Sequence, residues 1–310
     1  NNTALGHQAL SALTLGGSNT AIGKGAGILM TANDNNVIVG YNAMSSADGG
    51  EDQNTVVGRS AGASIDAAGS DHNVIIGDAA GTGGGAAMAS CVVIGSAAMN
   101  STAANAQTGT VAMGADALTA LSSGTGNVAI GFEALSTIAD GDYMTAVGYQ
   151  AFKDAAPTGG GADAYGVAIG YLAGSKTTTS DGATYIGGKA GEVHTGGRAN
   201  TVVGALAFKD TDAGGTSLTS IENCAFGYNA MGGTWGNYKI DSCVAVGMNA
   251  LSGALAATNV TGTVAIGGNA LTALTTGTQN TAIGYTALDA EDTGLSLIHI
   301  SEPTRRTPIS

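Results

Sequence analysis

The chain has 310 residues, of which 52 are glycine and only 11% are charged, and its formal net charge is −13. An acidic chain lacks the basic face that displaces counterions from nucleic acids or binds anionic lipids. We therefore predict no nucleic-acid partner. No apolar run reaches the roughly 18 residues that suggest a membrane-spanning helix, so we also predict no direct membrane insertion.

A short pattern recurs along the chain, and its clearest copy occupies residues 280–288 with the sequence NTAIGYTAL. Its glycine serves as an anchor. A large apolar residue always precedes the anchor, Thr or Val stands three before it in fifteen copies, and Ala always stands three after it. Self-similarity at a short period is typical of stacked-repeat architectures. The sixteen anchors are Gly6, Gly23, Gly40, Gly58, Gly77, Gly95, Gly114, Gly131, Gly148, Gly170, Gly187, Gly204, Gly227, Gly247, Gly267 and Gly284.

The residues before each anchor predict a short strand, because β-branched and aliphatic side chains dominate there. Glycine after the strand suits a sharp corner, since it tolerates positive φ. Asn stands four before the anchor in nine copies, which fits either a turn or a ladder of stacked amides between coils. The fold class is therefore all-β: a parallel β-solenoid of sixteen short repeats that forms one domain over residues 1–294.

The alternation of side chains along a strand defines two faces. Residues one and three before the anchor, such as Ile130, are interpreted as the coil interior. The residue two before the anchor is Ala in ten copies and a larger apolar residue in six. Apolar residues on both faces imply that both are covered, so we interpret this second face as a subunit contact; the alternative is that it lies under a loop. The predicted trimer interface is Ile38, Val56, Ile75, Val93, Tyr185 and Val202.

A second apolar pair follows many anchors, for example Leu118 with Leu121 and Leu271 with Leu274. This spacing fits either a single helical turn or a second short strand, and periodicity alone does not separate them.

The two ends differ from the repeats. The sequence starts within a repeat at Asn1, so we expect a fragment with both ends missing. The period stops after Gly294, and residues 295–305 (LSLIHISEPTR) resemble the conceptual translation of a sequencing adapter. We interpret residues 295–310 as an artefactual non-repeat tail, typical of a gene assembled from metagenomic reads.

The units NTAIG at 19–23, NVAIG at 127–131 and NTAIG at 280–284 resemble the head repeats of YadA-type trimeric autotransporter adhesins, and equally the repeats of phage and viral tail fibres. The resemblance covers the chain to about residue 290, although the period here is longer. It implies a left-handed β-roll that assembles as a homotrimer. It also implies an extracellular location, on a bacterial cell surface or a virion tail fibre, and attachment to a host-surface glycan or protein.

Residues that match a catalytic motif are compared with the residues at the equivalent positions of the other repeats. Residues 58–62 match the nucleophile pattern G-x-S-x-G, but Ser60 sits at a variable repeat position and no helix follows it. We predict that the chain is not an enzyme. His7, His72 and His194 lie in different coils without metal-ligand spacing, so they are expected on the surface.

Neither a disulfide framework nor a cofactor is predicted. Cys91, Cys224 and Cys243 are too few and too scattered, and are expected to be small buried fillers. Acidic clusters occur in loops, and Ca²⁺ bound there is the alternative to solvated charge. The clusters are Asp48, Glu51 and Asp52; Asp140 and Asp142; Asp210 and Asp212; and Asp289, Glu291 and Asp292.

Recognition is expected where the repeat is broken, in the long coils between Gly204 and Gly267. Trp235 and Tyr238 lie there in a glycine-rich insertion and could stack on sugar rings; the alternative is that Trp235 folds back onto its own coil. The sequence thus predicts a structural and adhesive surface fibre segment. A carbohydrate-binding or ice-binding solenoid is the second hypothesis; ice binding is disfavoured because Thr alternates with Val at positions expected to be interior.

Overall fold

The computed structural model describes residues 1–84, 86–101, 106–155, 165–178, 181–209, 220–235, 238–254, 259–290 and 293–300. Over these residues the chain forms strands, turns and bends and no helix, so the all-β prediction is confirmed. The chain divides into two compact units, Asn1–Asp181 and Gly182–Ser310.

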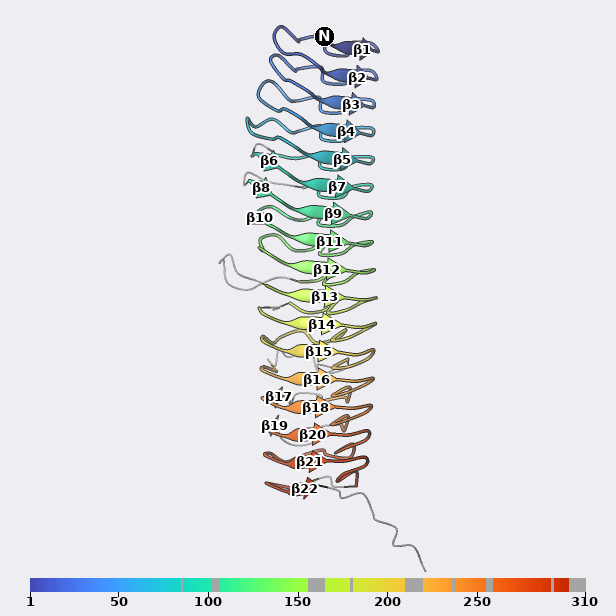
Figure 1. Ribbon diagram of the computed structural model, residues 1–310, viewed down its shortest axis with the longest axis vertical. Helices are drawn as coiled ribbons and strands as arrows, with labels where there is room; N and C mark the ends of the chain where they lie inside the picture. Colours follow the sequence, from blue (N-terminus) through green and yellow to red (C-terminus); the bar gives the residue numbers. More distant parts are fainter. Residues whose placement is uncertain are drawn as a thin grey trace, which may run out of the picture. The chain divides into compact units, whose positions relative to one another are not determined.

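The first unit is a parallel β-solenoid in which each coil adds one three-residue strand to a growing sheet (Figure 1). The sheet order is β1-β2-β3-β4-β5-β7-β9-β11-β12-β13, and every neighbouring pair is parallel. A narrower parallel sheet joins β6, β8 and β10. The strands are β1 Thr3–Leu5, β2 Thr20–Ile22, β3 Val37–Val39, β4 Thr55–Val57, β5 Val74–Ile76, β6 Met88–Ala89, β7 Val92–Ile94, β8 Gln107–Thr108, β9 Val111–Met113, β10 Gly124–Thr125, β11 Val128–Ile130, β12 Thr145–Val147 and β13 Val167–Ile169.

The second unit repeats this architecture. Its main sheet runs β14-β15-β16-β18-β20-β21-β22 with all pairs parallel, and β17 pairs with β19 beside it. The strands are β14 Thr184–Ile186, β15 Thr201–Val203, β16 Cys224–Phe226, β17 Ile240–Asp241, β18 Val244–Val246, β19 Val260–Thr261, β20 Val264–Ile266, β21 Thr281–Ile283 and β22 Ile298–Ile300. Each of the sixteen predicted repeats supplies a main-sheet strand that ends directly before its anchor glycine, so the β-solenoid prediction is confirmed.

The anchor glycines lie at a close approach between successive coils. Gly131 has φ +137°, in a region that residues with a side chain rarely adopt. A Cβ built on it would collide with the carbonyl oxygen of Gly148, the equivalent glycine of the next coil. The same collision is found at Gly227, where an added Cβ would lie 2.5 Å from the carbonyl oxygen of Gly247. Glycine is therefore required at this position by both backbone conformation and space.

The structure reverses the predicted assignment of the two strand faces. The residue two before each anchor in β2–β21 points into its coil and is fully buried, as Ala129 is in β11. Its neighbours point outward: the side chain of Ile130, expected in the interior, is 37% exposed. The prediction of the subunit contact was therefore wrong, because all its residues lie inside a single chain with 0% exposure; they are Ile38, Val56, Ile75, Val93, Tyr185 and Val202.

The volume of the coil explains why this face is internal. The interior also holds the alanine three after the anchor and, in many coils, a large apolar residue four after it, such as Ala134 and Leu135. In most coils a small strand residue lies beside them, although Ile38 is buried together with Met44, and Val202 together with Phe208. Where the strand residue is Tyr185, the position four after the anchor is Gly191, and a Cβ there would collide with the tyrosine ring. In this coil the large strand residue is therefore accommodated by a glycine at the position four after the anchor.

The second apolar pairs form neither of the two structures considered for them. Leu118 and Leu121 are buried in a tight turn in which the Leu121 N–H donates to the Leu118 carbonyl oxygen at 3.2 Å. Leu118 has φ +52°, which ends any helical geometry there.

The main sheet continues past the predicted boundary at residue 294. Strand β22 pairs with β21, and the Leu297 N–H donates to Oδ1 of Asn280 at 2.9 Å. Leu297 thus takes the repeat position that Asn280 takes one coil earlier. Residues 295–300 therefore add one more strand to the end of the main sheet, while residues 301–310 lie outside the described residues. The origin of this tail in an adapter stays a prediction.

The inward orientation of the middle strand residue is testable with one substitution at two alanines. Ala129→Asp buries a carboxylate in an apolar coil and should lower the free energy of unfolding by about 3 kcal/mol or more. Ala139→Asp, at an exposed loop alanine, should change it by less than about 0.5 kcal/mol. Chemical denaturation of the full chain measures both. Equal losses would contradict the orientation of the strand.

Candidate interaction surface

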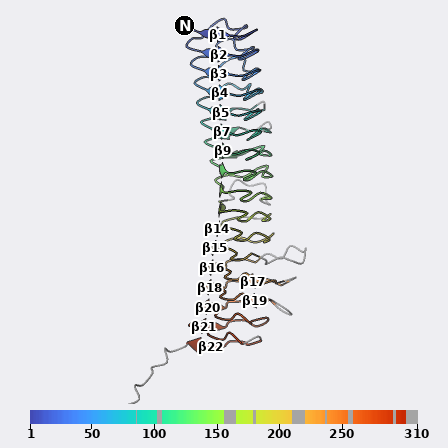
Figure 2. The same ribbon diagram turned by 90° about the vertical axis from the view of Figure 1, so that its right-hand side faces the viewer.

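In the first unit, residues one and three before each anchor form a continuous outward row, which we call the outward stripe. The strands line up in one column and the turns extend mostly to one side of it (Figure 2). The stripe contains only Thr, Val, Leu, Ile and Met, and no charged residue. Several members are more than a third exposed: Ile22 at 39%, Val37 at 41%, and Ile76, Ile130 and Ile169 at 37–38%.

The second unit carries an equivalent stripe of Thr, Val, Ile, Cys and Phe, again without charge. Its most exposed members are Phe226 at 40%, Val246 at 38% and Ile266 at 36%. Contiguous exposed apolar surface of this kind is a common feature of protein interaction sites.

Aromatic side chains border the outward stripe where β11, β12 and β13 lie. On the carboxyl side of these strands, Phe132, Tyr149 and Tyr171 follow the anchors of three successive coils. The ring centroids are 5.2 Å apart between Phe132 and Tyr149, and 5.6 Å apart between Tyr149 and Tyr171. On the amino side, Tyr143 stacks on Tyr165 with centroids 5.9 Å apart and planes at 13°. All five rings are 38–53% exposed, so both edges of the stripe are aromatic here.

Sequence reasoning missed this cluster. A signal was present, because the residue after the anchor is aromatic in three successive repeats, at Phe132, Tyr149 and Tyr171. These rings belong to coils 17 and 22 residues apart, and only the stack makes them neighbours.

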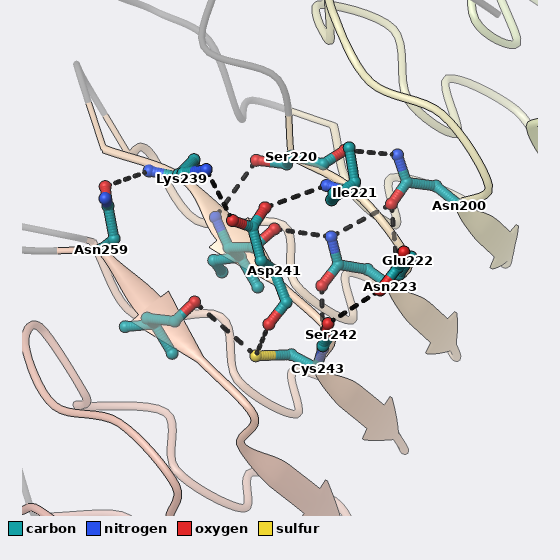
Figure 3. Close-up of polar contacts among 12 residues, drawn as sticks. Asn200, Ser220, Ile221, Glu222, Asn223, Lys239, Asp241, Ser242, Cys243 and Asn259 are labelled. Carbon is teal, nitrogen blue, oxygen red and sulfur yellow. Dashed lines mark hydrogen bonds and ion pairs between the residues drawn. The ribbon is translucent and has the colours of Figure 1, made fainter. Parts of the chain in front are cut away.

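A column of buried polar side chains runs inside the coils, and Figure 3 shows part of it in the second unit. Asn223 Nδ2 donates to Asn200 Oδ1 at 3.1 Å and to the Ile240 carbonyl oxygen at 2.6 Å. The Cys243 N–H donates in turn to Asn223 Oδ1 at 3.0 Å. In the first unit, Asn54 and Asn73 repeat this contact. The amide-ladder interpretation of the repeated Asn is therefore confirmed, and the ladder satisfies buried backbone groups.

Trp235 does not lie on the surface. Its side chain is 0% exposed and packs edge-on against Phe208, with ring centroids 5.1 Å apart. The prediction that Trp235 is a binding residue was wrong, and the alternative that it folds back into the coils is confirmed. Burial of so large an apolar ring stabilises the fold more than exposure does. Tyr238 is partly exposed and donates its N–H to the Trp235 carbonyl oxygen at 3.0 Å, and its part in recognition stays a prediction.

His194 is also internal, contrary to expectation. It is fully buried between Phe208, with ring centroids 4.9 Å apart, and Tyr185, with centroids 6.4 Å apart. Burial lowers the pKa of His194 to about 3 because the charged form loses its hydration. His194 is therefore neutral at pH 7. His7 and His72 lie exposed, as expected.

The cysteines share no bond, and only two of them are buried. Cys91 and Cys243 occupy the column position that Asn holds in other coils, and burial raises the pKa of the Cys243 thiol to about 12. Cys224 is partly exposed on the outward stripe, so its expected role as a buried filler was wrong.

The acidic loops differ in their surroundings. Glu51 is buried and accepts hydrogen bonds from Asn33 Nδ2 at 2.7 Å and from the Gly49 N–H at 3.0 Å; loss of hydration raises its pKa. Among the described residues, no group of three or more His, Cys, Asp or Glu side chains is arranged to hold a metal ion. Asp210, Asp212, Glu291 and Asp292 lie outside the described residues.

Comparison of the chain with protein-family models, with curated proteins and with solved structures gives no match. Among the described residues, no helix is long and apolar enough to cross a membrane.

Acid should weaken the second unit through His194. The unfolded histidine titrates near its ordinary pKa of about 6.5, whereas the folded one resists protonation until about pH 3. Stability from the neutral ring is complete above pH 6.5 and is lost as the pH falls towards 3, by about 1.4 kcal/mol per pH unit. Denaturant titrations of the parent and of His194→Gln between pH 7 and 4 should show the smaller pH dependence in the variant. Parallel profiles would contradict the assignment.

Proposed function

We propose that the chain is a non-enzymatic segment of an extracellular surface fibre that assembles as a homotrimer through the outward stripe. The observation that carries this proposal is the stripe itself, an uncharged and partly exposed apolar row that recurs on the main-sheet strands of both units. The trimeric state comes from the resemblance of the repeats to those of trimeric adhesins.

The size of the stripe fits an assembly surface. A strand of three residues is about 10 Å long and successive coils are about 4.8 Å apart. The stripe therefore covers about 480 Å² in the first unit, more than half of the roughly 800 Å² per partner of a standard protein interface, and about 290 Å² in the second.

A further copy of the chain is the partner that matches this surface along its length. Side chains on the stripe recur once per coil, so a partner fits them ridge for ridge only if it has the same axial period. Another copy of the chain has the same axial period because it has the same sequence of repeats. The absence of charge favours the same partner, because neither surface then has to lose a hydrated ion on association.

The role in attachment follows the resemblance. Repeats of this kind would supply length and rigidity to a fibre on a bacterial cell surface or a virion tail, and the fibre would bind a surface glycan or protein. Because Trp235 is buried, Tyr238 is the only residue of the predicted recognition pair that remains available for such contact.

Charges placed on the stripe should dissociate the trimer without unfolding the coils. Ile76→Lys combined with Ile130→Lys puts two ammonium groups into the contact, yet both positions already face water in the single chain. Light scattering should give three chain masses for the parent and one for the variant, with the circular dichroism of the sheet unchanged. Ala68→Lys with Ala139→Lys, at exposed loop positions, is the matched control and should remain trimeric.

A folded, monomeric parent chain would contradict self-association. Attachment is measured separately, by the retention of chain-coated beads on epithelial cell layers relative to albumin-coated beads. Equal retention of the two kinds of bead would contradict the adhesive role and leave the assembly result standing.

Ice binding gains support from one observation. The Thr and Val residues three before the anchors were expected inside, but they face outward, so the argument against an ice-binding ladder no longer holds; Thr20 and Thr55 are examples. The row is nevertheless mixed. Val interrupts it in eight coils, and Phe132 and Tyr149 rise beside it. We therefore expect no thermal hysteresis from the purified chain, and a measurable freezing-point gap would make ice binding the better function.

A further inference from the structure

We propose that the aromatic cluster of Phe132, Tyr149, Tyr171, Tyr143 and Tyr165 fixes the axial register between chains in the assembly. This inference rests on the self-association proposed above. It concerns how neighbouring copies adopt one axial alignment among several that would otherwise be nearly equal in free energy.

A repeating stripe by itself specifies register poorly. Successive coils present almost the same residues: Val111 and Met113 in β9 are followed by Val128 and Ile130 in β11. A neighbour displaced by one coil therefore meets a nearly identical surface. Register is weakly specified wherever the paired surfaces repeat in this way.

The aromatic cluster breaks this equivalence. In the two coils that precede it, the residues after the anchors are Ser96 and Ala115, which are small. Phe132, Tyr149 and Tyr171 then place three large rings at the edge of the stripe, with 38%, 45% and 53% exposure. A neighbour shifted by one coil would place its own rings one coil away from the equivalent rings of this chain. Among parallel chains, only those with no axial offset bring the clusters to the same height.

The ring geometry favours another copy over a sugar as the occupant. The planes of Phe132 and Tyr149 differ by 21°, and those of Tyr143 and Tyr165 by 13°. Neighbouring rings thus cover one another's faces and leave mainly edges outward. Stacking on a sugar ring needs a free flat aromatic face. Outward ring edges spaced at nearly the coil repeat instead form a row of ridges and grooves, which fits the same row on an identical chain.

The experiment reads register from cross-links between two labelled chains. Cys224→Ser removes the partly exposed native thiol, and Cys91 and Cys243 are buried. One chain then carries Thr55→Cys and the other Val74→Cys, at positions that are paired between adjacent coils of the first unit. Dibromobimane, which bridges only thiols close together, is added to mixed assemblies. Cross-links between like chains report aligned register, and those between unlike chains report a one-coil offset.

With the cluster intact, aligned cross-links should dominate. Replacing Phe132, Tyr149, Tyr171, Tyr143 and Tyr165 with alanine should raise the ratio of offset to aligned cross-links about tenfold, as expected when a register preference on the order of RT ln 10 is lost. The variant should remain folded and trimeric by circular dichroism and light scattering. The matched control is Tyr41→Ala with Tyr228→Ala and Tyr285→Ala, which removes exposed rings at the same repeat position from coils whose neighbours lack an aromatic there; its ratio should stay at the parent value.

The outcomes separate the two proposals. A monomeric parent, or a trimer that forms no cross-link at either position, overturns both the contact surface and the register role. A trimer whose cross-link ratio is the same with and without the cluster overturns the register role alone. Binding of cellohexaose by the parent that is lost in the alanine variant, with the ratio unchanged, would assign the cluster to sugar recognition and also overturn it.

Discussion

The structure depends on backbone packing against backbone at the anchor glycines. At these corners the chain turns with φ near +140°, and at Gly131 and Gly227, for example, the carbonyl oxygen of the next coil occupies the space where a Cβ would lie. Because no side chain intervenes, successive coils approach closely enough for parallel hydrogen bonds between their short strands. A three-residue strand has little stability alone, and the column of glycines lets each one share its bonds with two neighbours.

This close stacking also determines what each coil can contain. The interior is narrow: it takes a small strand residue such as Ala129 in most coils, and Gly191 leaves the space that the ring of Tyr185 fills. The column of Asn side chains bonds to backbone groups of adjacent coils inside the stack, as Asn223 does to the Ile240 carbonyl oxygen and to the Cys243 N–H. A buried amide that bonds both above and below makes the stack specific as well as stable.

The same geometry leaves the outer face of the sheet apolar. Two of three residues in each strand point outward, and they are aliphatic or Thr in nearly every coil. The surface within each unit is therefore periodic, and a periodic surface by itself does not specify where along its length a second copy, as proposed above, would bind. A local irregularity, such as the aromatic cluster on β11–β13, then carries information that the regular coils lack.

The amino-acid sequence by itself determined the repeat and the position of the sixteen main strands that precede an anchor, because these follow from residues that recur at fixed distance from that anchor. It left the repeated Asn open between a turn and an amide ladder, which the contacts between coils decided. It did not determine which strand face is internal. Alternation defines two faces with apolar residues on both, and the interior was assigned to the wrong one; the structure places Ala129 inside, together with Ala134 and Leu135 from another part of the coil. Only the tertiary structure buried Trp235 and His194 beside Phe208 and brought Phe132, Tyr149 and Tyr171 together, since those contacts join residues of different coils.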